Sequence, residues 1–173
     1  IDACLEIVNK YHPNAEDIEK IDILSSKYTM HLLAEPCKWS PRNIVDLQFS
    51  MPFQAAVAFK NGKVTVDEFD VAYIDDELIK RLMAHTTVAM DEEFERRYPA
   101  HYSSAVTITM KDGTTYSATV DDPKGDWRNP VTYEDVVNKF RYLANRVYSD
   151  PLRTESIVEF VNDLENQKDM SEL

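Results

Sequence analysis

Two loops of this sequence combine residue types suited to binding an anion. Trp39 and Arg42 lie in the first loop, residues 36–42, which also contains two prolines, and residues 124–130 contain a second tryptophan, arginine and proline. Proline stiffens the backbone, and a guanidinium group can bind a carboxylate through two parallel hydrogen bonds. The pattern therefore predicts recognition of a carboxylate or a similar anion, with packing or interface loops as the alternative.

The other reactive residue types do not assemble into a catalytic or metal-binding set. The four histidines are not spaced as ligands on a predicted helix: His12, His31, His85 and His101. The acidic run at residues 67–77 has no glycine where a calcium-binding loop needs its turn, and the G-x-S-x-G sequence of serine hydrolases is absent. Cys37 is followed by a lysine, which is only a weak sign of a reactive thiol. We expect no metal, no cofactor and no complete catalytic site in this chain.

The composition describes an acidic globular protein. The 173 residues include 31 acidic and 19 basic side chains, which gives a formal net charge of −12. This balance argues against a nucleic-acid partner and against binding to an anionic membrane surface, because both need clustered lysine and arginine. The longest uncharged runs, residues 47–59 and 98–110, are too short to cross a membrane, and the spacing of the three glycines fits neither a P-loop nor a dinucleotide-binding turn. Cys4 and Cys37 are too few for a disulfide framework, so a cytoplasmic location is expected.

The N-terminal part predicts a helix followed by a strand. Residues 1–11 place apolar side chains at helical spacing. Residues 18–33 are rich in isoleucine, tyrosine and threonine, which predicts a long strand with an irregularity near Ser25 and Ser26. Because the chain starts inside the first helix and without methionine, we expect it to be part of a longer protein.

An apolar segment predicts a helix in the core. Residues 44–60 have no polar stripe, which is typical of a buried helix. Pro52 is compatible with the first turn of a helix, so the regular helix is expected to begin near Met51. Gly62 is expected to end it as a C-cap.

The remaining segments predict a small sheet and further helices. They are, in order, a helix at 77–83, a strand at 86–94, a hairpin at 105–110 and 115–120, and helices at 132–147 and 157–164. Thr132 and Asp135 resemble a capping box for the first of the last two helices. The predicted fold class is therefore α+β, with a small, mainly antiparallel sheet packed with helices. We expect a single domain over residues 1–165 and a frayed tail over residues 166–173.

Three groups of motifs follow one another along almost the whole chain. The first is Ile1-Asp-Ala with His12-Pro13 and residues 16–21, and the second is DLQFSMPFQAAVAFKNG at residues 46–62. The third is the hairpin with its Asp-Gly turn, then a P-x-G…NP segment at 123–130 and a Lys-Phe pair at 139–140. In order and spacing, this series resembles the C-terminal domain of the MmgE/PrpD family, which includes 2-methylcitrate dehydratase, cis-aconitate decarboxylase and an iminodisuccinate epimerase.

The resemblance implies half of a lyase or isomerase. Members of the family join a large helical N-terminal domain to a smaller α+β C-terminal domain. They remove or return a proton beside a carboxylate of a small polycarboxylic acid, without metal or organic cofactor. The principal catalytic histidine and lysine of the family lie ahead of the stretch that corresponds to this chain. The implied partners are therefore the N-terminal helical domain, a small polycarboxylate and a second copy in a homodimer. The implied metabolic setting is propionate metabolism. The isolated chain is expected to be catalytically inert.

Five residues are the substrate-binding candidates. Ser50 matches the serine of the family motif, and Gln48 and Phe53 belong to the same segment, which approaches the active cleft in the family. Trp39 and Arg42 precede that segment and are expected to line the mouth of the cleft. Phe53 takes the place where several relatives have tyrosine, so a phenolic donor would be missing, which counts against a decarboxylase. Helix initiation and core packing are the alternative roles of Ser50 and Phe53.

The alternative function is a stand-alone small-molecule-binding or protein-assembly module without catalysis, whose apolar helix faces a partner. If the resemblance holds, we expect instead an exposed apolar patch on the face that meets the helical domain, which a homodimer could also cover. Neither the substrate nor the choice between dehydratase, epimerase and decarboxylase follows from the sequence.

Overall fold

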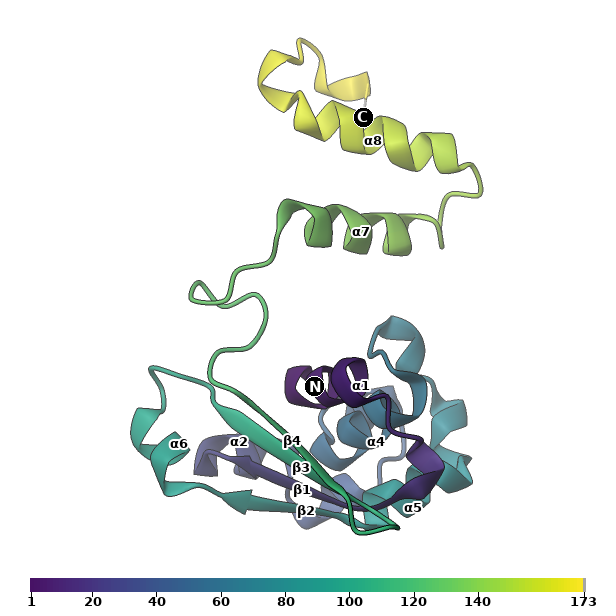
Figure 1. Cartoon of the computed structure of the whole chain (residues 1–173). Coiled ribbons are helices and arrows are strands. Elements are labelled where there is room, and N and C mark those ends of the chain that lie inside the picture. Colours follow the sequence, from purple (N-terminus) through teal and green to yellow (C-terminus); the bar gives the residue numbers. More distant parts are fainter. Residues whose placement is uncertain (173) are drawn as a thin grey trace. The chain divides into compact units, whose positions relative to one another are not determined.

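The computed structural model of the protein describes residues 1–172 (Figure 1). The chain forms two compact units, which divide between Pro123 and Lys124. That residues 1–165 act as one domain stays a prediction.

The first unit is built on a four-stranded sheet. Its strands are β1 (Ile18–Ser25), β2 (Thr86–Met90), β3 (Ser104–Met110) and β4 (Thr115–Val120), in the spatial order β2-β1-β3-β4. β1 pairs in parallel with β2, whereas β3 pairs antiparallel with both β1 and β4. The predicted α+β class with a mainly antiparallel sheet is therefore confirmed, and the parallel pair adds one long-range connection that runs through helices.

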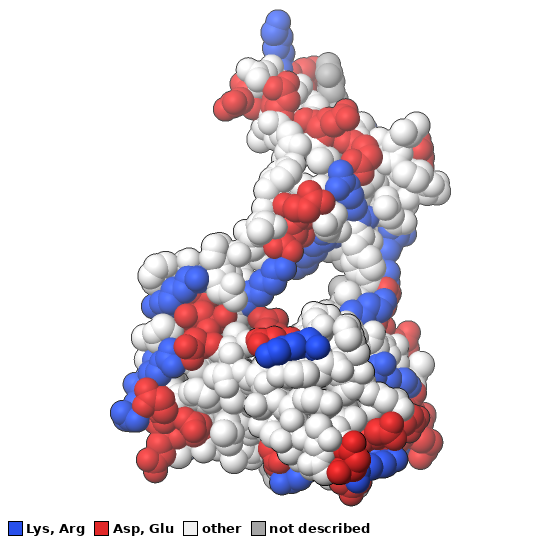
Figure 2. All heavy atoms as spheres, in the orientation of Figure 1, with Lys and Arg blue, Asp and Glu red and all other residues white. Residues whose placement is uncertain are grey.

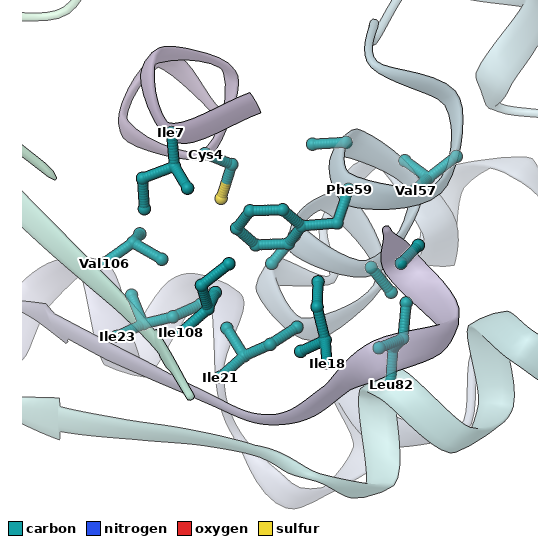
Figure 3. Close-up of a cluster of buried hydrophobic side chains, with 14 of the residues drawn as sticks. Cys4, Ile7, Ile18, Ile21, Ile23, Val57, Phe59, Leu82, Val106 and Ile108 are labelled. Carbon is teal, nitrogen blue, oxygen red and sulfur yellow. The ribbon is translucent and has the colours of Figure 1, made fainter. Parts of the chain in front are cut away.

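The core of this unit lies on one face of the sheet. Helices α1 (Asp2–Tyr11), α4 (Met51–Asn61) and α5 (Glu77–Ala84) pack there. Figure 3 shows Cys4 and Ile7 of α1 and Phe59 of α4 meeting isoleucine and valine side chains from β1 and β3. The alternation of the strands explains this one-sided core, because successive side chains point to opposite faces of a sheet.

The opposite face of the sheet is polar. Lys20 and Asp22 of β1 form an ion pair, with Nζ and Oδ1 2.8 Å apart. Thr107 of β3 is paired opposite Asp22. The core buries one face, and polar side chains occupy the other. Figure 2 shows acidic and basic side chains of this unit intermixed rather than gathered by sign on the visible face.

Helix α4 confirms the prediction of a buried helix. Seven of its residues are buried, and Pro52 lies in its first turn. Ser50 is its N-cap, and Gly62 ends it with φ +67° in the left-handed region. The apolar side chains of α4 therefore pack inside this unit, and the alternative of a stand-alone assembly module stays a prediction.

Two predicted strands are too long, and both end at a helix cap. The strand predicted over residues 18–33 stops at Ser25, where Ser26 caps helix α2 (Lys27–Leu33). The strand predicted over residues 86–94 stops at Met90, where Asp91 caps helix α6 (Glu92–Arg97). In both places a side-chain oxygen accepts a hydrogen bond from a backbone N–H of the first helical turn, and this local gain outweighs the strand preference of the residues that follow.

Short helical segments connect these elements. They are η1 (Ala15–Asp17), η2 (Pro36–Trp39), α3 (Ile44–Gln48), η3 (Val66–Glu68) and η4 (Val71–Asp75). The segment predicted as a loop at the first Trp–Arg site thus contains one tight turn of 3-10 helix, which begins at a proline.

The second unit is a pair of helices, α7 (Tyr133–Ala144) and α8 (Pro151–Asn162). The predicted capping box of Thr132 and Asp135 is present, with both reciprocal hydrogen bonds. The short segments η5 (Leu164–Asn166) and η6 (Met170–Glu172) follow α8. The predicted tail, residues 166–173, extends by one residue beyond the described part, and its fraying stays a prediction.

Candidate functional site

Ser50 joins the first Trp–Arg loop to helix α4. Its Oγ donates a hydrogen bond to the backbone oxygen of Lys38, at 2.6 Å. The same Oγ accepts a hydrogen bond from the backbone N–H of Phe53, at 3.2 Å. The residue is completely buried, so its hydroxyl holds two pieces of backbone in place.

Trp39 fixes the other side of the loop. Its indole Nε1 donates a hydrogen bond to the backbone oxygen of Met83 in α5, at 3.0 Å. Trp39 lines a surface hollow of about 420 Å³ together with Phe53 and Tyr73, and Asp75 and Lys80 supply the charges of that hollow. The hollow therefore combines aromatic walls with one cation and one carboxylate.

Arg42 lies beside a second hollow. Its side chain is 85% exposed, and Nε lies 3.4 Å from Oδ2 of Asp46. The hollow has a volume of about 330 Å³ and is also lined by Cys37, Lys38 and Ser40. Lys38, Arg42 and the carboxylate of Asp46 thus line the same space, and an incoming carboxylate would compete with Asp46 for the Arg42 guanidinium.

Gln48 lies at the C-terminal end of α3 and is exposed. Its backbone oxygen accepts a hydrogen bond from Nε2 of Gln54, at 2.5 Å. The Nζ of Lys38 lies 5.7 Å from the ring centre of the neighbouring Phe49, within reach of a cation–π interaction. α3 also exposes Ile44 and Val45, of which Val45 is 60% exposed. An apolar patch, Ile44, Val45 and Phe49, therefore adjoins the Arg42 hollow along the chain.

Phe53 is fully buried. Its ring centre lies 6.2 Å from that of Phe69 and 6.5 Å from that of Tyr73. The segment that carries these two rings follows α4 and closes over Phe53. Phe53 therefore belongs to the core and also lines the larger hollow from its inner side.

A buried carboxylate holds this covering segment. Glu68 is 1% exposed, and its Oε2 accepts hydrogen bonds from the backbone N–H and the hydroxyl of Thr65, at 2.8 and 2.6 Å. Burial raises the pKa of the Glu68 carboxyl, but the hydrogen bonds from Thr65 and from Asn61, with the charge of Lys63, outweigh that effect and hold the pKa below its usual range. Glu68 is therefore charged at neutral pH and stabilises the turn as an anion.

The side chains around the loop are of types that can bind an anion. Among the described residues, no histidine lines either hollow, and no group of three histidine, cysteine, aspartate or glutamate residues is placed to hold a metal ion. The carboxylate of Asp46 is engaged by the backbone N–H and the guanidinium of Arg42. The cationic side chains can hold and orient an anion, and the carboxylates of Asp46 and Asp75 are the acidic groups that line the two hollows.

The second Trp–Arg loop belongs to the second unit. The ring of Trp127 is 77% exposed, and the guanidinium of Arg128 lies 4.2 Å from its centre. The aromatic ring and the cation thus stack on each other, as the composition of this loop allows.

The five predicted residues fall into two groups. Arg42 and Gln48 are exposed and Trp39 is half-buried, whereas Ser50 and Phe53 are buried. The role of all five in substrate binding stays a prediction. Sequence reasoning did not select Lys80 and Tyr73 for a site, because tertiary packing alone brings them next to Trp39.

Comparison with known proteins identifies the family. A sequence model of the MmgE/PrpD C-terminal domain matches residues 1–164. The chain belongs to the MmgE/PrpD family. The resemblance predicted from the order of the motifs is thereby confirmed, and the match runs through both compact units.

Named relatives of this MmgE/PrpD domain are enzymes. It is 27% identical to cis-aconitate decarboxylase of Mus musculus over 128 residues, which are 74% of this chain and 26% of that protein. It is 31% identical to cis-aconitate decarboxylase-like protein oryM of Aspergillus oryzae over 127 residues, which are 73% of this chain and 26% of that protein. It is 25% identical to mitochondrial 2-methylcitrate dehydratase of Yarrowia lipolytica over 113 residues, which are 63% of this chain and 21% of that protein. The MmgE/PrpD domain thus spans about a quarter of the length of these relatives. Within the described part, no helix is long and apolar enough to cross a membrane.

Proposed function

We propose that this MmgE/PrpD domain closes the active-site cleft of a lyase or isomerase that acts on a small polycarboxylic acid. The names of its relatives, cis-aconitate decarboxylase and 2-methylcitrate dehydratase, support an acid of this class. In this proposal the domain binds carboxylate groups of the substrate, and the helical N-terminal domain supplies the groups that move the proton.

The observation that carries the proposal is the anchored pair of cations. Lys38 and Arg42 line one hollow, and the hydrogen bond from Ser50 to the Lys38 backbone holds the loop on helix α4. Because this bond fixes the backbone of the loop, an anion that binds there does not have to order that backbone. An acid with several carboxylates would offer one group to this pair and keep another near the reacting carbon.

Gln48 and Trp39 have supporting roles in this proposal. Gln48 is exposed and lines neither hollow, and in this proposal its amide donates a hydrogen bond to a part of the substrate that extends beyond the Arg42 hollow. Trp39 keeps the loop against α5 through its bond to Met83. In this proposal Ser50 caps helix α4 and holds the loop through its hydrogen bonds, and Phe53 forms part of the apolar wall of the larger hollow.

The absence of a phenol at Phe53 bears on the reaction type. A phenylalanine ring cannot donate a hydrogen bond or protonate an enolate. We therefore propose dehydration or epimerisation rather than decarboxylation, with the substrate tested among citrate-like acids. A cytoplasmic location and a homodimer belong to the same proposal, although one relative is named as mitochondrial.

The proposal predicts a specific effect of removing the Arg42 charge. In the full-length enzyme, Arg42→Met is expected to raise KM for the acid by roughly 10- to 100-fold and to change kcat much less, because it removes a binding contact remote from the proton transfer. Lys111→Met is the matched control, since Lys111 is exposed on the hairpin turn between β3 and β4, and its KM is expected to stay within about twofold. An unchanged KM in Arg42→Met would refute carboxylate binding at this hollow.

A further inference from the structure

The larger hollow beside Trp39 has mainly apolar walls. Aromatic rings and aliphatic side chains from four segments of the first unit line it: Trp39, Pro41, Phe53, Tyr73, Ile74 and Met83. Pro41, Phe53 and Met83 are buried, so the packing of the unit holds these walls in place. A hollow of this kind binds an apolar group because it removes the surface of that group from water.

The charged groups of this hollow neutralise one another at its rim. Nζ of Lys80 lies 3.6 Å from Oδ1 of Asp75 and 3.1 Å from Oε1 of Glu77. The side chain of Asp75 is 94% exposed and that of Lys80 is 47% exposed, so water also solvates this ion pair. A cation with two carboxylates beside it attracts an incoming anion only weakly. The part of a ligand that enters the larger hollow is therefore expected to be uncharged.

Ser40 joins the larger hollow to the hollow at Arg42, because it lines both. The residues around it alternate between the two hollows. Lys38 and Arg42 line the smaller one, whereas Trp39 and Pro41 line the larger one. The two hollows are thus parts of one surface built on a single loop, and one ligand can reach into both.

The larger hollow is bigger than a methyl group requires. Its volume is about 420 Å³, whereas one water molecule, which is similar in size to a methyl group, takes about 30 Å³ in the liquid. A short acid bound at Arg42 would leave most of the apolar wall in contact with water. The hollow can hold a chain of roughly four to six carbon atoms or one aromatic ring.

We propose that the acid bound by this MmgE/PrpD domain carries an alkyl or aryl substituent of roughly four to six carbon atoms, which lies in the larger hollow while a carboxylate lies at Arg42. The carboxylate holds the acid in place, and the substituent selects it among polycarboxylates. Acids without the substituent keep the carboxylate contacts and bind more weakly. This inference rests on the proposed function, because it takes the position of the carboxylate from it.

An NMR titration of the chain with 2-alkylsuccinates measures the contribution of the substituent. The probes are methylsuccinate, butylsuccinate and hexylsuccinate, which carry the same two carboxylates. The indole N–H of Trp39 reports binding, because it is bonded to Met83 in the wall of the larger hollow, and the indole N–H of Trp127 in the second unit is the internal reference. Each added CH₂ is expected to lower Kd by roughly two- to threefold, since complete burial of a CH₂ group is worth about fourfold. Hexylsuccinate should therefore bind about 30- to 200-fold more tightly than methylsuccinate.

Two variants separate the apolar contact from the charged one. Ala84→Phe places a ring in the larger hollow, because Ala84 is exposed at the end of α5 and lines that hollow. With this ring in place, the Kd values of the three probes are expected to agree within about twofold. Ala89→Phe is the matched control, since Ala89 is exposed on β2 outside both hollows, and it should keep the full dependence on chain length. Arg42→Met is expected to weaken the binding of all three probes by the same factor.

Three outcomes would overturn the inference. The first is equal Kd values for the three probes, or no shift of the Trp39 signal with any of them. The second is the same dependence on chain length in Ala84→Phe as in Ala89→Phe. The third is a Kd that does not depend on chain length in the full-length protein, measured by calorimetry, because another part of the polypeptide would then fill the hollow. A dependence on chain length that Ala84→Phe removes, together with unchanged Kd values in Arg42→Met, would instead refute the proposed carboxylate site and leave the apolar site standing.

Discussion

Replacing Ser50 by alanine removes both hydrogen bonds that hold the candidate loop on helix α4. The backbone N–H of Phe53 loses its acceptor and the backbone oxygen of Lys38 loses its donor. Loss of a serine N-cap costs about 1 kcal/mol. Leaving the Lys38 carbonyl without a partner adds about 1–2 kcal/mol, at the low end of the range because that residue is only half-buried. We therefore expect Ser50→Ala to lower the free energy of unfolding of the first unit by about 2–3 kcal/mol.

Tryptophan fluorescence can follow this unit alone. The chain has two tryptophans, and Trp127→Phe removes the exposed one that belongs to the second unit. In that background, Trp39 reports on the loop and on α5. With a urea m-value of about 1.5 kcal/mol/M, the expected loss lowers the urea midpoint by about 1.3–2 M.

Ser117→Ala is the matched control, because Ser117 is exposed on β4, and it should change the free energy of unfolding by about 0.5 kcal/mol or less. If Ser50→Ala unfolded at the same urea concentration as this control, with the same m-value, the hydroxyl would not be holding the loop. The loop that carries Lys38 and Arg42 would then not be held on helix α4 by Ser50.

Three further predictions concern groups outside that loop. The Asp135 carboxyl accepts a hydrogen bond from Lys124 and others from Thr132, which lower its pKa to about 2. The charged carboxyl therefore contributes fully to the stability of the second unit above about pH 4, which is the pKa of aspartate in an unfolded chain. This contribution is lost as the pH falls toward 2. An NMR titration of the Asp135 carboxyl should have its midpoint near pH 2, and this midpoint should rise in Lys124→Met. A midpoint near pH 4 in the unsubstituted chain would contradict the capping box. Glu68→Ala should destabilise the first unit by about 3 kcal/mol because it leaves buried donors without an acceptor, and a urea midpoint equal to that of the original protein would show that the anion does not hold the turn. Gly62→Ala should cost about 1 kcal/mol because φ is +67° while the added Cβ would lie at an ordinary 3.6 Å from Val8, so a thermal midpoint at or above the original would be inconsistent with the left-handed cap.

Local signals made much of the fold predictable. The helix from Met51 to Gly62 has a proline at its start, a glycine at its end and apolar residues throughout, and each of these features acts within one helical turn or along one helix. The hairpin between β3 and β4 likewise depends on an Asp-Gly turn and on alternation within a few residues. These elements have the predicted type and nearly the predicted ends.

The ends of β1 and β2 were not predictable in the same way. Serine and aspartate occur in strands, turns and caps, so Ser26 and Asp91 become decisive only when the sheet has fixed where its strands stop. The parallel pairing of these two strands is a contact between segments about 60 residues apart, and no periodicity within either segment encodes it. The same holds for the larger hollow, since Tyr73 and Lys80 meet Trp39 only through tertiary packing.

The residues of the candidate site also differ in whether local sequence or tertiary packing determines their placement. The composition of the loop was enough to select Arg42 and Trp39, because proline, tryptophan and arginine together are uncommon in a helix or strand interior. The burial of Phe53 depends on the segment after α4, whose Phe69 and Tyr73 rings lie beside it, and Ser50 is buried where its hydroxyl bonds the Lys38 backbone. The sequence predicted packing as one of two roles for these residues, and their burial explains how they would support the site from beneath.

The most direct test of the account is proton exchange at the substrate carbon. The purified chain and the full-length enzyme are each incubated in D₂O with cis-aconitate, citrate and 2-methylcitrate, and incorporation of deuterium beside a carboxylate is followed by NMR. The account predicts incorporation or turnover with the full-length enzyme for at least one acid and none above the buffer rate with the isolated chain. Incorporation catalysed by the isolated chain would contradict the claim that this domain binds the acid but does not move its proton.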